Sequence, residues 1–320
     1  MRLRLGTRGS ALALAQSQLV AGAVTAASGV PVDLVEIVTP GDRSSAPVQR
    51  LGVGVFVSAL RDALLAKEID FAVHSYKDLP TAPADELVIA AVPPREDPRD
   101  VLVARDGLKL SELPPSSIVG TGAIRRIAQI KALGLGLTTA PIRGNVDSRL
   151  RRVASGELDA VVLAQAGLAR LGRLDEATES LDPSLMLPAP AQGALAVECR
   201  ADSDLVVELL RALDDPATRA TVTAERALLA ALEAGCSAPV AGLASVTTTE
   251  VNLRGAVFSE DGRHAIRMSR TGPVAEADGV GRQLAADLLA AGADRLFTPP
   301  GAVPVPGQAD QNDAVSGSAQ

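Results

Sequence analysis

The feature that most constrains the fold is a pair of short segments that occur twice in the same order. Residues 5–16 (LGTRGSALALAQ) are similar to residues 119–129 (VGTGAIRRIAQ), and residues 67–79 (KEIDFAVHSYKDL) are similar to residues 156–168 (GELDAVVLAQAGL). Chance similarity of short Ala-rich segments is the alternative, but the conserved order favours a true repeat. We therefore expect two related lobes with a cleft between them.

Both halves alternate strand and helix patterns. In the first half we expect strands at residues 3–5, 32–38, 71–73 and 87–92, a helix over 11–27 that Ser10 caps, and an amphipathic helix through Phe56, Leu60, Leu64 and Leu65. In the second half we expect strands at 118–119 and 160–164 and helices at 123–133 and 166–171. This alternation predicts an α/β fold with largely parallel sheets.

The chain changes character at three places. The segment PPREDPRD (93–100) has three prolines and dense charge, which predicts a crossing between domains. From about Pro216 a helix (217–234), three alternating strands (240–246, 251–258 and 264–269) and a final helix (274–289) predict a small α+β domain. The tail at 298–320 is rich in Pro, Gly, Ser, Gln and Asp and is predicted to be disordered.

Composition argues against several classes of protein. The net charge is -7 and aromatic residues make up 2% of the chain, which argues against a nucleic-acid-binding surface. No apolar run approaches the ~20 residues of a membrane span, and we expect no signal peptide. Only two cysteines are present, far apart, so we expect a reducing, cytoplasmic location rather than a disulfide framework.

Arginine dominates the positions at which ligands commonly bind. Phosphate-loop, nucleophile-elbow and metal-ligand patterns are missing from the sequence, and His74 and His264 are isolated, so no metal site is predicted. Arginine in the first turn of a helix opposes the helix dipole, but it suits a site where an anion docks. A solvated surface is the alternative for any single arginine. Together they favour a ligand with several carboxylates; the six are Arg8, Arg125, Arg126, Arg143, Arg149 and Arg170.

Three other side chains are candidates for chemistry. Asp78, beside Lys77 in HSYKDLP, follows a predicted buried strand, where a carboxylate can move protons or stabilise a cation. A merely charged loop explains the same pattern. Cys236 lies between Gly235 and Ser237 after a predicted helix, which indicates an exposed thiol. Cys199 ends an apolar strand and is expected to be buried and inert.

Taken together, the motifs resemble the hydroxymethylbilane synthase (porphobilinogen deaminase) family. The resemblance extends over nearly the whole chain to about residue 297. Each piece is modest alone, but their order and spacing are specific. The pieces are TRGSALALAQ (7–16), VTPGD (38–42), HSYKDLP (74–80), REDPRD (95–100), GTGAIRR (120–126), IRGNVDSRL (142–150), PAQGALAVECR (190–200), TAERALL (223–229) and GCSAP (235–239).

The resemblance implies two lobes like those of periplasmic binding proteins plus a third domain. It places residues 1–93 and 193–213 in domain 1, residues 99–187 in domain 2 and residues 216–297 in domain 3. It also implies a dipyrromethane cofactor joined by a thioether to Cys236. On this cofactor such an enzyme adds four porphobilinogen units, each with loss of ammonia, and releases hydroxymethylbilane for porphyrin and haem biosynthesis.

The family pattern also assigns roles to individual residues. It makes Asp78 the catalytic aspartate. The cofactor-binding residues would be Cys236, Arg8, Ser10, Lys77, Arg125, Arg126, Arg143 and Arg149, and the substrate-binding residues Arg8, Arg143, Arg149, Arg170 and Gln192. We expect porphobilinogen as the small-molecule substrate, a monomer, and no nucleic-acid or membrane partner.

Two departures from the family pattern leave an alternative open. Many members have GGKG where residues 51–54 are LGVG, so Val53 replaces a lysine, and GTGA (120–123) lacks a hydroxyl that members usually carry. The alternative is a non-catalytic, two-lobed protein that binds small anions, or a divergent paralogue. Such a protein would not need an exposed Cys236.

Overall fold

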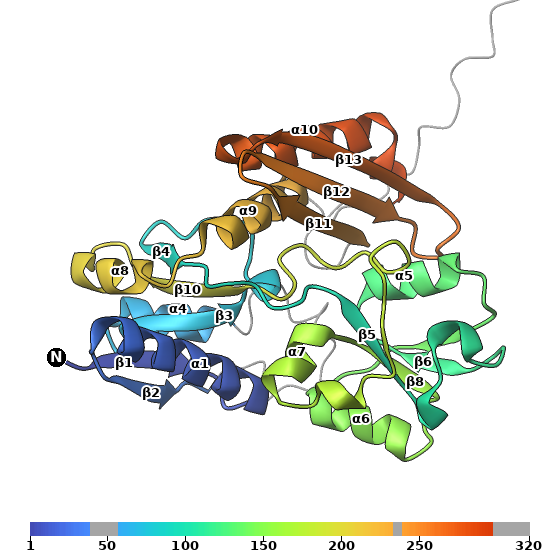
Figure 1. The fold of residues 1–320 in the computed structure, drawn as a ribbon, viewed down its shortest axis with the longest axis horizontal. Coiled ribbons are helices and arrows are strands. Elements are labelled where there is room, and N and C mark those ends of the chain that lie inside the picture. Colours follow the sequence, from blue (N-terminus) through green and yellow to red (C-terminus); the bar gives the residue numbers. More distant parts are fainter. Residues whose placement is uncertain (39–56, 233–238, 297–320) are drawn as a thin grey trace, which may run out of the picture.

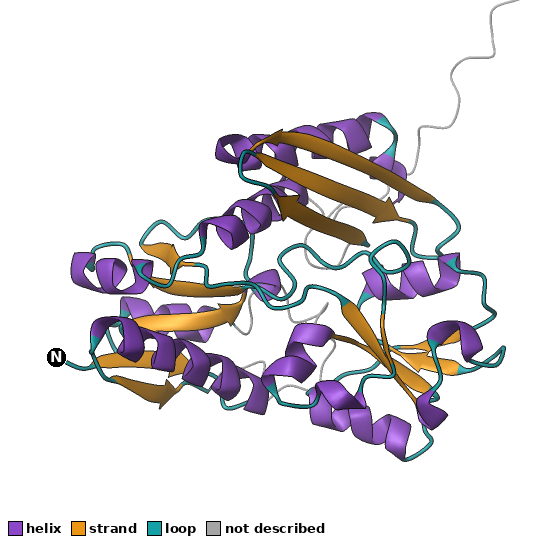
Figure 2. Cartoon of the chain, viewed as in Figure 1, coloured by secondary structure: helices purple, strands orange, loops and turns teal. Residues whose placement is uncertain are grey.

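The computed structural model describes residues 1–38, 57–232 and 239–296. In this part of the chain the strands form three sheets, and helices pack against each of them (Figures 1 and 2). Two of the sheets have five strands each and belong to the two lobes, and the third has three strands.

The first lobe is built on a five-stranded sheet in the order β2-β1-β3-β10-β4. β1 pairs in parallel with β2 and β3, whereas β10 pairs antiparallel with both β3 and β4. Four strands therefore run one way and β10 runs the other. The elements are β1 (Leu3–Thr7), α1 (Ala11–Ser28), β2 (Val32–Glu36), α4 (Ser58–Leu65), β3 (Phe71–Ser75), β4 (Leu87–Ala91), β10 (Leu195–Arg200) and α8 (Asp204–Arg211).

The second lobe repeats this topology with the order β7-β6-β8-β5-β9. β6 pairs in parallel with β7 and β8, and β5 pairs antiparallel with β8 and β9. The matching strand orders and directions confirm the repeat and the largely parallel sheets. The elements are β5 (Asp100–Ala104), β6 (Ile118–Gly120), α5 (Ile124–Ala132), β7 (Thr138–Ala140), α6 (Val146–Ala154), β8 (Ala160–Ala164), α7 (Gln165–Arg170) and β9 (Glu179–Ser180).

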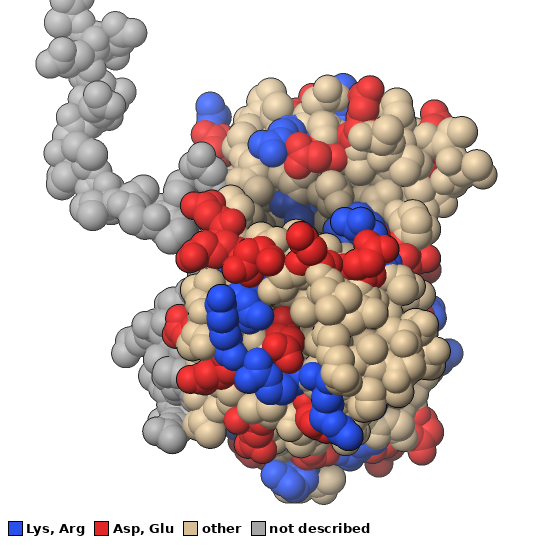
Figure 3. All heavy atoms as spheres, turned by 90° about the vertical axis from the view of Figure 1, so that its left-hand side faces the viewer, with Lys and Arg blue, Asp and Glu red and all other residues tan. Residues whose placement is uncertain are grey.

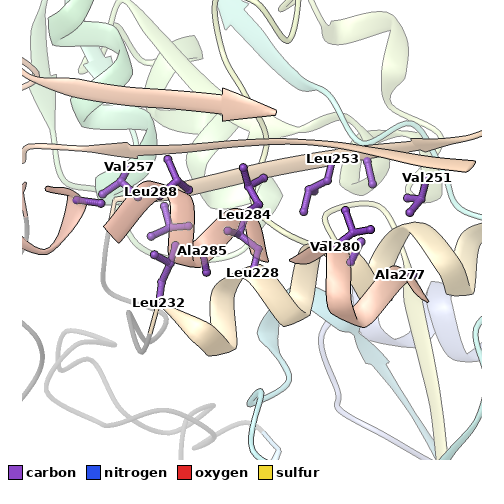
Figure 4. Packing of buried hydrophobic residues seen from close by; sticks show 14 of the residues in the cluster. Leu228, Leu232, Val251, Leu253, Val257, Ala277, Val280, Leu284, Ala285 and Leu288 are labelled. Carbon is purple, nitrogen blue, oxygen red and sulfur yellow. The ribbon is translucent and has the colours of Figure 1, made fainter. Parts of the chain in front are cut away.

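The third domain packs two helices on one face of an antiparallel sheet, β11-β12-β13. Leu228 of α9 and Leu232, the residue after this helix, meet Leu284 and Leu288 of α10 beneath the sheet (Figure 4). The α/β class with a small α+β domain is thus confirmed. The elements are α9 (Pro216–Ala231), β11 (Val240–Val246), β12 (Glu250–Phe258), β13 (Ala265–Pro273) and α10 (Ala277–Ala290).

Short 3-10 helices make up several connections: η1 (Tyr76–Asp78), η2 (Arg105–Gly107), η3 (Leu110–Glu112), η4 (Leu174–Glu176), η5 (Val274–Glu276) and η6 (Ala293–Leu296). Longer helices begin where the sequence provides caps. The Ser10 hydroxyl accepts a hydrogen bond from the amide of Ala13, and the Asp215 carboxylate accepts one from Thr218. Leu65, expected on the apolar face of its helix, is instead exposed, and Phe56 lies outside the described residues.

Helix α1 has the length and composition of a membrane span, with a mean hydropathy of 1.3 over 18 residues. In the structure Val20 and Val24 of this helix are buried in the core of the first lobe with Leu3, Leu5 and other residues. α1 packs on the first lobe through these residues, and 22% of the 18-residue window is buried in the structure.

Charged side chains of both signs are interspersed on the face shown in Figure 3. Elsewhere on the described surface, exposed ion pairs include Arg2–Asp33 at 2.7 Å and Arg4–Asp70 at 2.9 Å. Pairs this exposed contribute little stability, about 0–1 kcal/mol each.

The two crossings between the lobes pack backbone against backbone. The amide of Glu96 donates to the carbonyl of Gly193 at 3.2 Å. Gly193 has a φ of +88°, and a Cβ there would lie 2.4 Å from the Glu96 carbonyl oxygen. Ala191, two residues earlier, also has a positive φ, of 60°. This tight turn places Gln192 between the lobes and leaves no room for a side chain at residue 193.

Candidate active site

Asp78 is presented at the end of a buried strand. β3 ends at Ser75, and η1 follows directly with Tyr76, Lys77 and Asp78. The amide of Tyr76 donates to Ala194 of the neighbouring segment at 3.0 Å, and the side chain of Leu79 is buried. The turn is thus anchored on both sides of Asp78, whose own side chain is exposed.

Arg125 and Arg126, in the first turn of α5, are buried around an aspartate of the chain itself. Arg125 Nη1 lies 2.8 Å from Asp100 Oδ2, and Arg126 Nη2 lies 2.7 Å from Asp100 Oδ1. Burial alone would raise the pKa of Asp100, but the charges and hydrogen bonds of the two guanidinium groups outweigh it and hold this pKa well below its usual range. Asp100 thus supplies an anion that the sequence pattern had assigned to a ligand.

Gln192 connects this cluster to the Asp78 turn. It is buried, and its Nε2 donates to Asp100 Oδ1 and to the carbonyl of Pro98, each at 2.8 Å. Its Oε1 accepts from Lys77 Nζ at 3.4 Å and from Arg126 Nη2 at 3.5 Å. One amide side chain therefore contacts groups of both lobes.

Lys77 and Arg149 add positive charge close to Asp78. Burial lowers the pKa of Lys77 to about 8, although the negative charge of Asp78 opposes this shift. Burial also lowers the pKa of Arg149 to about 10, with a further contribution from Arg126, while Asp78 again opposes the shift. The cations that interact here outnumber the carboxylates: Lys77, Arg125, Arg126, Arg143 and Arg149 interact electrostatically with one another or with Asp78 and Asp100. Such an excess of cations suits a ligand with several carboxylates.

The remaining arginines lie around this cluster or at the lobe crossing. Arg149 donates from Nε to the carbonyl of Gly144 at 3.0 Å, and Arg143 is half-buried just before it. Arg170 donates to the carbonyl of Gly193 at 2.6 Å, at the crossing between the lobes. Arg8 is half-buried in the turn after β1, and Ser10 acts as the cap of α1.

The two cysteines have different outcomes. Cys199 is fully buried in β10, which confirms the expectation of a buried thiol, and burial raises the pKa of this thiol to about 11. Cys236 lies outside the described residues, as do Val53 and the rest of LGVG. α9 ends at Ala231, five residues before Cys236 in the sequence.

His74 is not isolated, contrary to the expectation from the sequence. Its Nε2 lies 3.1 Å from Oε2 of Glu198, a buried carboxylate that also accepts hydrogen bonds from Arg61, with Nη2 at 2.8 Å. The partners are far apart in sequence, so only the pairing of β3 with β10 brings them together. Among residues 1–38, 57–232 and 239–296, His, Cys, Asp and Glu form no group of three or more able to hold a metal ion.

A surface hollow lies elsewhere, between α4 and β4. Asp62, Asp85 and Glu86 line it together with Arg61 and apolar side chains such as Leu65 and Leu87. Its acidic groups would repel a ligand rich in carboxylates, so the hollow does not compete with the cationic cluster for such a ligand.

Sequence reasoning missed a third buried carboxylate, Glu225 of α9. Its carboxylate accepts hydrogen bonds from both terminal nitrogens of Arg95, at 2.7 and 2.9 Å, and from the backbone amides of Ala191 and Ala244. These bonds tie both lobe crossings to the third domain. The signal available in the sequence was its place in TAERALL, where a glutamate interrupts an otherwise apolar helix face.

The fold and the site define a two-lobed α/β protein with a cationic cluster between its lobes and a third, α+β domain. Residues 3–208 match the family model described as porphobilinogen deaminase, dipyromethane cofactor binding domain, and residues 219–290 match its C-terminal domain. The chain belongs to the porphobilinogen deaminase family. The expectations of a transferase of tetrapyrrole synthesis and of a dipyrromethane cofactor are thereby confirmed, and the non-catalytic alternative is not favoured.

Curated relatives match over most of their length. A porphobilinogen deaminase of Nocardia farcinica is 59% identical over 314 residues, covering 94% of this chain and 90% of the relative. One from Mycobacterium tuberculosis strain H37Rv is 56% identical over 304 residues, covering 92% and 98%. Porphobilinogen deaminase 1 of Streptomyces coelicolor is 58% identical over 309 residues, covering 92% and 97%.

Similar solved structures include two binding proteins. A methionine-binding protein aligns with a TM-score of 0.41 and 12% identity, covering 66% of this chain and 88% of its own. A periplasmic substrate-binding protein of an ABC transporter from Coxiella burnetii aligns with a TM-score of 0.42 and 12% identity, covering 68% and 94%.

Proposed function

We propose that this chain joins four porphobilinogen units, each with loss of ammonia, on a dipyrromethane primer and releases hydroxymethylbilane. The observation that carries this proposal is the excess of partly desolvated cations near the exposed Asp78. Lys77 and Arg149 both interact electrostatically with its carboxylate. Each pyrrole of the substrate carries an acetate and a propionate, so a growing chain needs several cationic partners.

The residues present fit the cofactor by their chemistry. Within the cluster, Asp100 forms close ion pairs with Arg125 and Arg126. No described carboxylate lies as close to Lys77, Arg143 or Arg149. We assign carboxylate binding to them, together with Arg8, Ser10 and Arg170, and we assign to Arg125, Arg126 and Gln192 the role of shaping the wall of the site. The cofactor supplies a fixed primer for chain growth, and Cys236 is its proposed attachment point.

Asp78 is the proposed catalytic group. Loss of ammonia leaves positive charge on a pyrrole ring, and a fixed carboxylate stabilises that charge without attacking it as water would. The same carboxylate can accept or return a proton at the ring nitrogen.

The domain limits and the setting of the enzyme are also proposals. We assign residues 1–93 and 193–213 to domain 1, 99–187 to domain 2 and 216–297 to domain 3; the place of β10 in the first sheet supports the split first domain. We further propose a cytoplasmic monomer with a small-molecule substrate and no nucleic-acid or membrane partner, because the net charge is -7 and buried Cys199 forms no disulfide.

Intact-protein mass tests the attachment site. We expect an adduct equal to two pyrrole units on the wild-type chain, its absence from Cys236→Ser, and its retention in Cys199→Ser as the matched control. Peptide mapping that places the adduct on Cys199, or an adduct that survives in Cys236→Ser, would overturn the assignment of Cys236.

Single-turnover kinetics test Asp78. Asp78→Asn retains volume and hydrogen bonding but removes the charge, and we expect release of ammonia to slow by at least ~100-fold. Asp78→Glu, which retains a displaced anion, should keep more activity. Both variants are compared at equal cofactor loading, checked by mass. If loaded Asp78→Asn releases ammonia as fast as wild type, the charge is not catalytic.

A further inference from the structure

Arg226 of the third domain forms hydrogen bonds with the turn that carries Asp78. Its Nη1 donates to the carbonyls of Tyr76 at 3.2 Å and Leu79 at 2.9 Å, and its Nη2 donates to the carbonyl of Pro80 at 2.6 Å. Its guanidinium also lies over the Tyr76 ring, 4.4 Å from the centroid. These contacts fall on both sides of Lys77 and Asp78, and they leave the Asp78 carboxylate itself untouched.

The hydrogen bonds from Arg226 add to the apolar contacts that hold the turn within the first lobe. Leu79 is buried against Val57 and Ala196, and Tyr76 packs partly against the same cluster. The turn is thus fixed from below by apolar packing and from the other side by a planar cation that bonds three carbonyls. Half-buried carbonyls that lose such a donor must find another partner, so the turn would rearrange.

Arg226 also belongs to the element that leads to Cys236. α9 lies between the sheets of the first lobe and the third domain (Figure 1). Arg226 is five residues, or about 7.5 Å of helix, before the end of α9 at Ala231. The position of the third domain and the position of Asp78 are therefore coupled through one side chain.

We propose that Arg226 is a positioning residue for the reaction: it sets the place of Asp78 relative to the third domain. This rests on the proposed function, since it takes Asp78 as the catalytic group. A displacement of about 1 Å at a reacting group can slow a reaction on the order of 100-fold. The effect falls mainly on kcat, because Arg143 and Arg149, which are proposed to bind substrate carboxylates, belong to the other lobe. Lys77, also assigned to carboxylate binding, lies in the turn itself, so a smaller rise in KM accompanies the loss of kcat.

Arg219 provides a matched control on the same helix. It lies seven residues, or two turns, before Arg226 and likewise donates to two carbonyls of the first lobe, those of Ile89 and Ala90, both at 3.3 Å. It also pairs with Asp214 at 2.7 Å. Arg219 thus ties α9 to β4 with a similar set of bonds, but it does not contact the Asp78 turn through any of them.

The test compares Arg226→Gln, Arg226→Lys and Arg219→Gln in the cofactor-loaded full chain, with loading measured by intact mass. We expect kcat for porphobilinogen to fall ~10–100-fold in Arg226→Gln, with a smaller fold-increase in KM. Arg226→Lys, which keeps the charge and can bond one carbonyl, should recover part of the loss. Arg219→Gln should lower the melting temperature about as much as Arg226→Gln does, while its kcat stays within ~3-fold of wild type.

Equal kcat values in Arg226→Gln and Arg219→Gln would overturn the proposal, as would a loss confined to KM. If Arg226→Gln does not fold, Arg226→Lys and Tyr76→Leu replace it in the test. Both variants weaken the contacts between residue 226 and the turn, and wild-type kcat in both would overturn the proposal. Failure of the proposed function gives a different result, because wild-type protein would then carry no adduct and form no tetrapyrrole.

Discussion

Replacing Asp100 with asparagine isolates the buried anion that holds Arg125 and Arg126. The carboxylate accepts hydrogen bonds from three guanidinium N–H groups at 2.7 to 3.1 Å and one from Gln192 at 2.8 Å. In the variant, Oδ1 can still accept from Arg126. The new amide NH2, however, faces the Arg125 donor, and two buried cations lose their counter-ion.

The magnitude follows from these contacts. Removing one partner of a buried ion pair costs about 3–5 kcal/mol, because the remaining charge is left uncompensated. At about 2–4 °C per kcal/mol for a chain of this size, the melting temperature should fall by about 6–20 °C. The loss should be smaller at high salt or with a polycarboxylate bound, since either supplies anions to the two arginines.

Thermal unfolding monitored by circular dichroism measures this effect. Asp106→Asn is the control, because Asp106 is exposed and its ion pair with Arg105 is long, at 3.7 Å. This substitution should change the free energy of unfolding by less than about 0.5 kcal/mol. Asparagine also tolerates the positive φ of 57° at that position. A fall of less than about 2 °C in Asp100→Asn would refute the idea that Asp100 neutralises the pair.

Three further predictions concern the same region. Arg143→Leu should leave the melting temperature near wild type and raise KM at least ~30-fold, the low end for losing the partner of a desolvated carboxylate. Arg126→Leu should instead lower the melting temperature because Asp100 loses a partner; wild-type KM in Arg143→Leu, or a wild-type melting temperature in Arg126→Leu, would contradict this. With the pKa of Lys77 at about 8, kcat/KM should fall as pH rises above about 8 and the ammonium loses its proton. Lys77→Arg, protonated throughout, should lack this alkaline limb, and an unchanged limb would show that another group titrates. Gly193→Ala should lower the free energy of unfolding by at least the ~1–3 kcal/mol of a strained backbone, since its Cβ would lie 2.4 Å from the Glu96 carbonyl oxygen; an unchanged melting temperature would argue against the tight crossing.

Local patterns predicted most of the elements, because periodicity and caps depend on neighbours in the sequence. The helix that begins after Ser10 and the strand at Phe71 are examples. The pairing of β10 with β3 could not be found in this way, since it depends on a segment more than a hundred residues away. Only the family resemblance pointed to the return of the chain to the first lobe.

The candidate site was predicted by residue type but not by pairing. Arg125 and Arg126 stood out because they oppose the dipole of their helix, yet their partner Asp100 lies 25 residues earlier and meets them only in the folded lobe. A charged residue at the start of the fully buried strand DVLVA was the available signal. His74 seemed isolated for the same reason, because Glu198 reaches it across the sheet from β10.

The reversed strand β10 has a consequence for the order in which the molecule is made. All five strands of the second sheet lie between residues 100 and 180, so that lobe is complete in a continuous stretch of chain. The first sheet lacks an internal strand until residues 195–200 have been synthesised. During translation the N-terminal lobe must therefore wait, with the β3 and β4 edges unpaired, while the lobe that follows it in sequence can fold first.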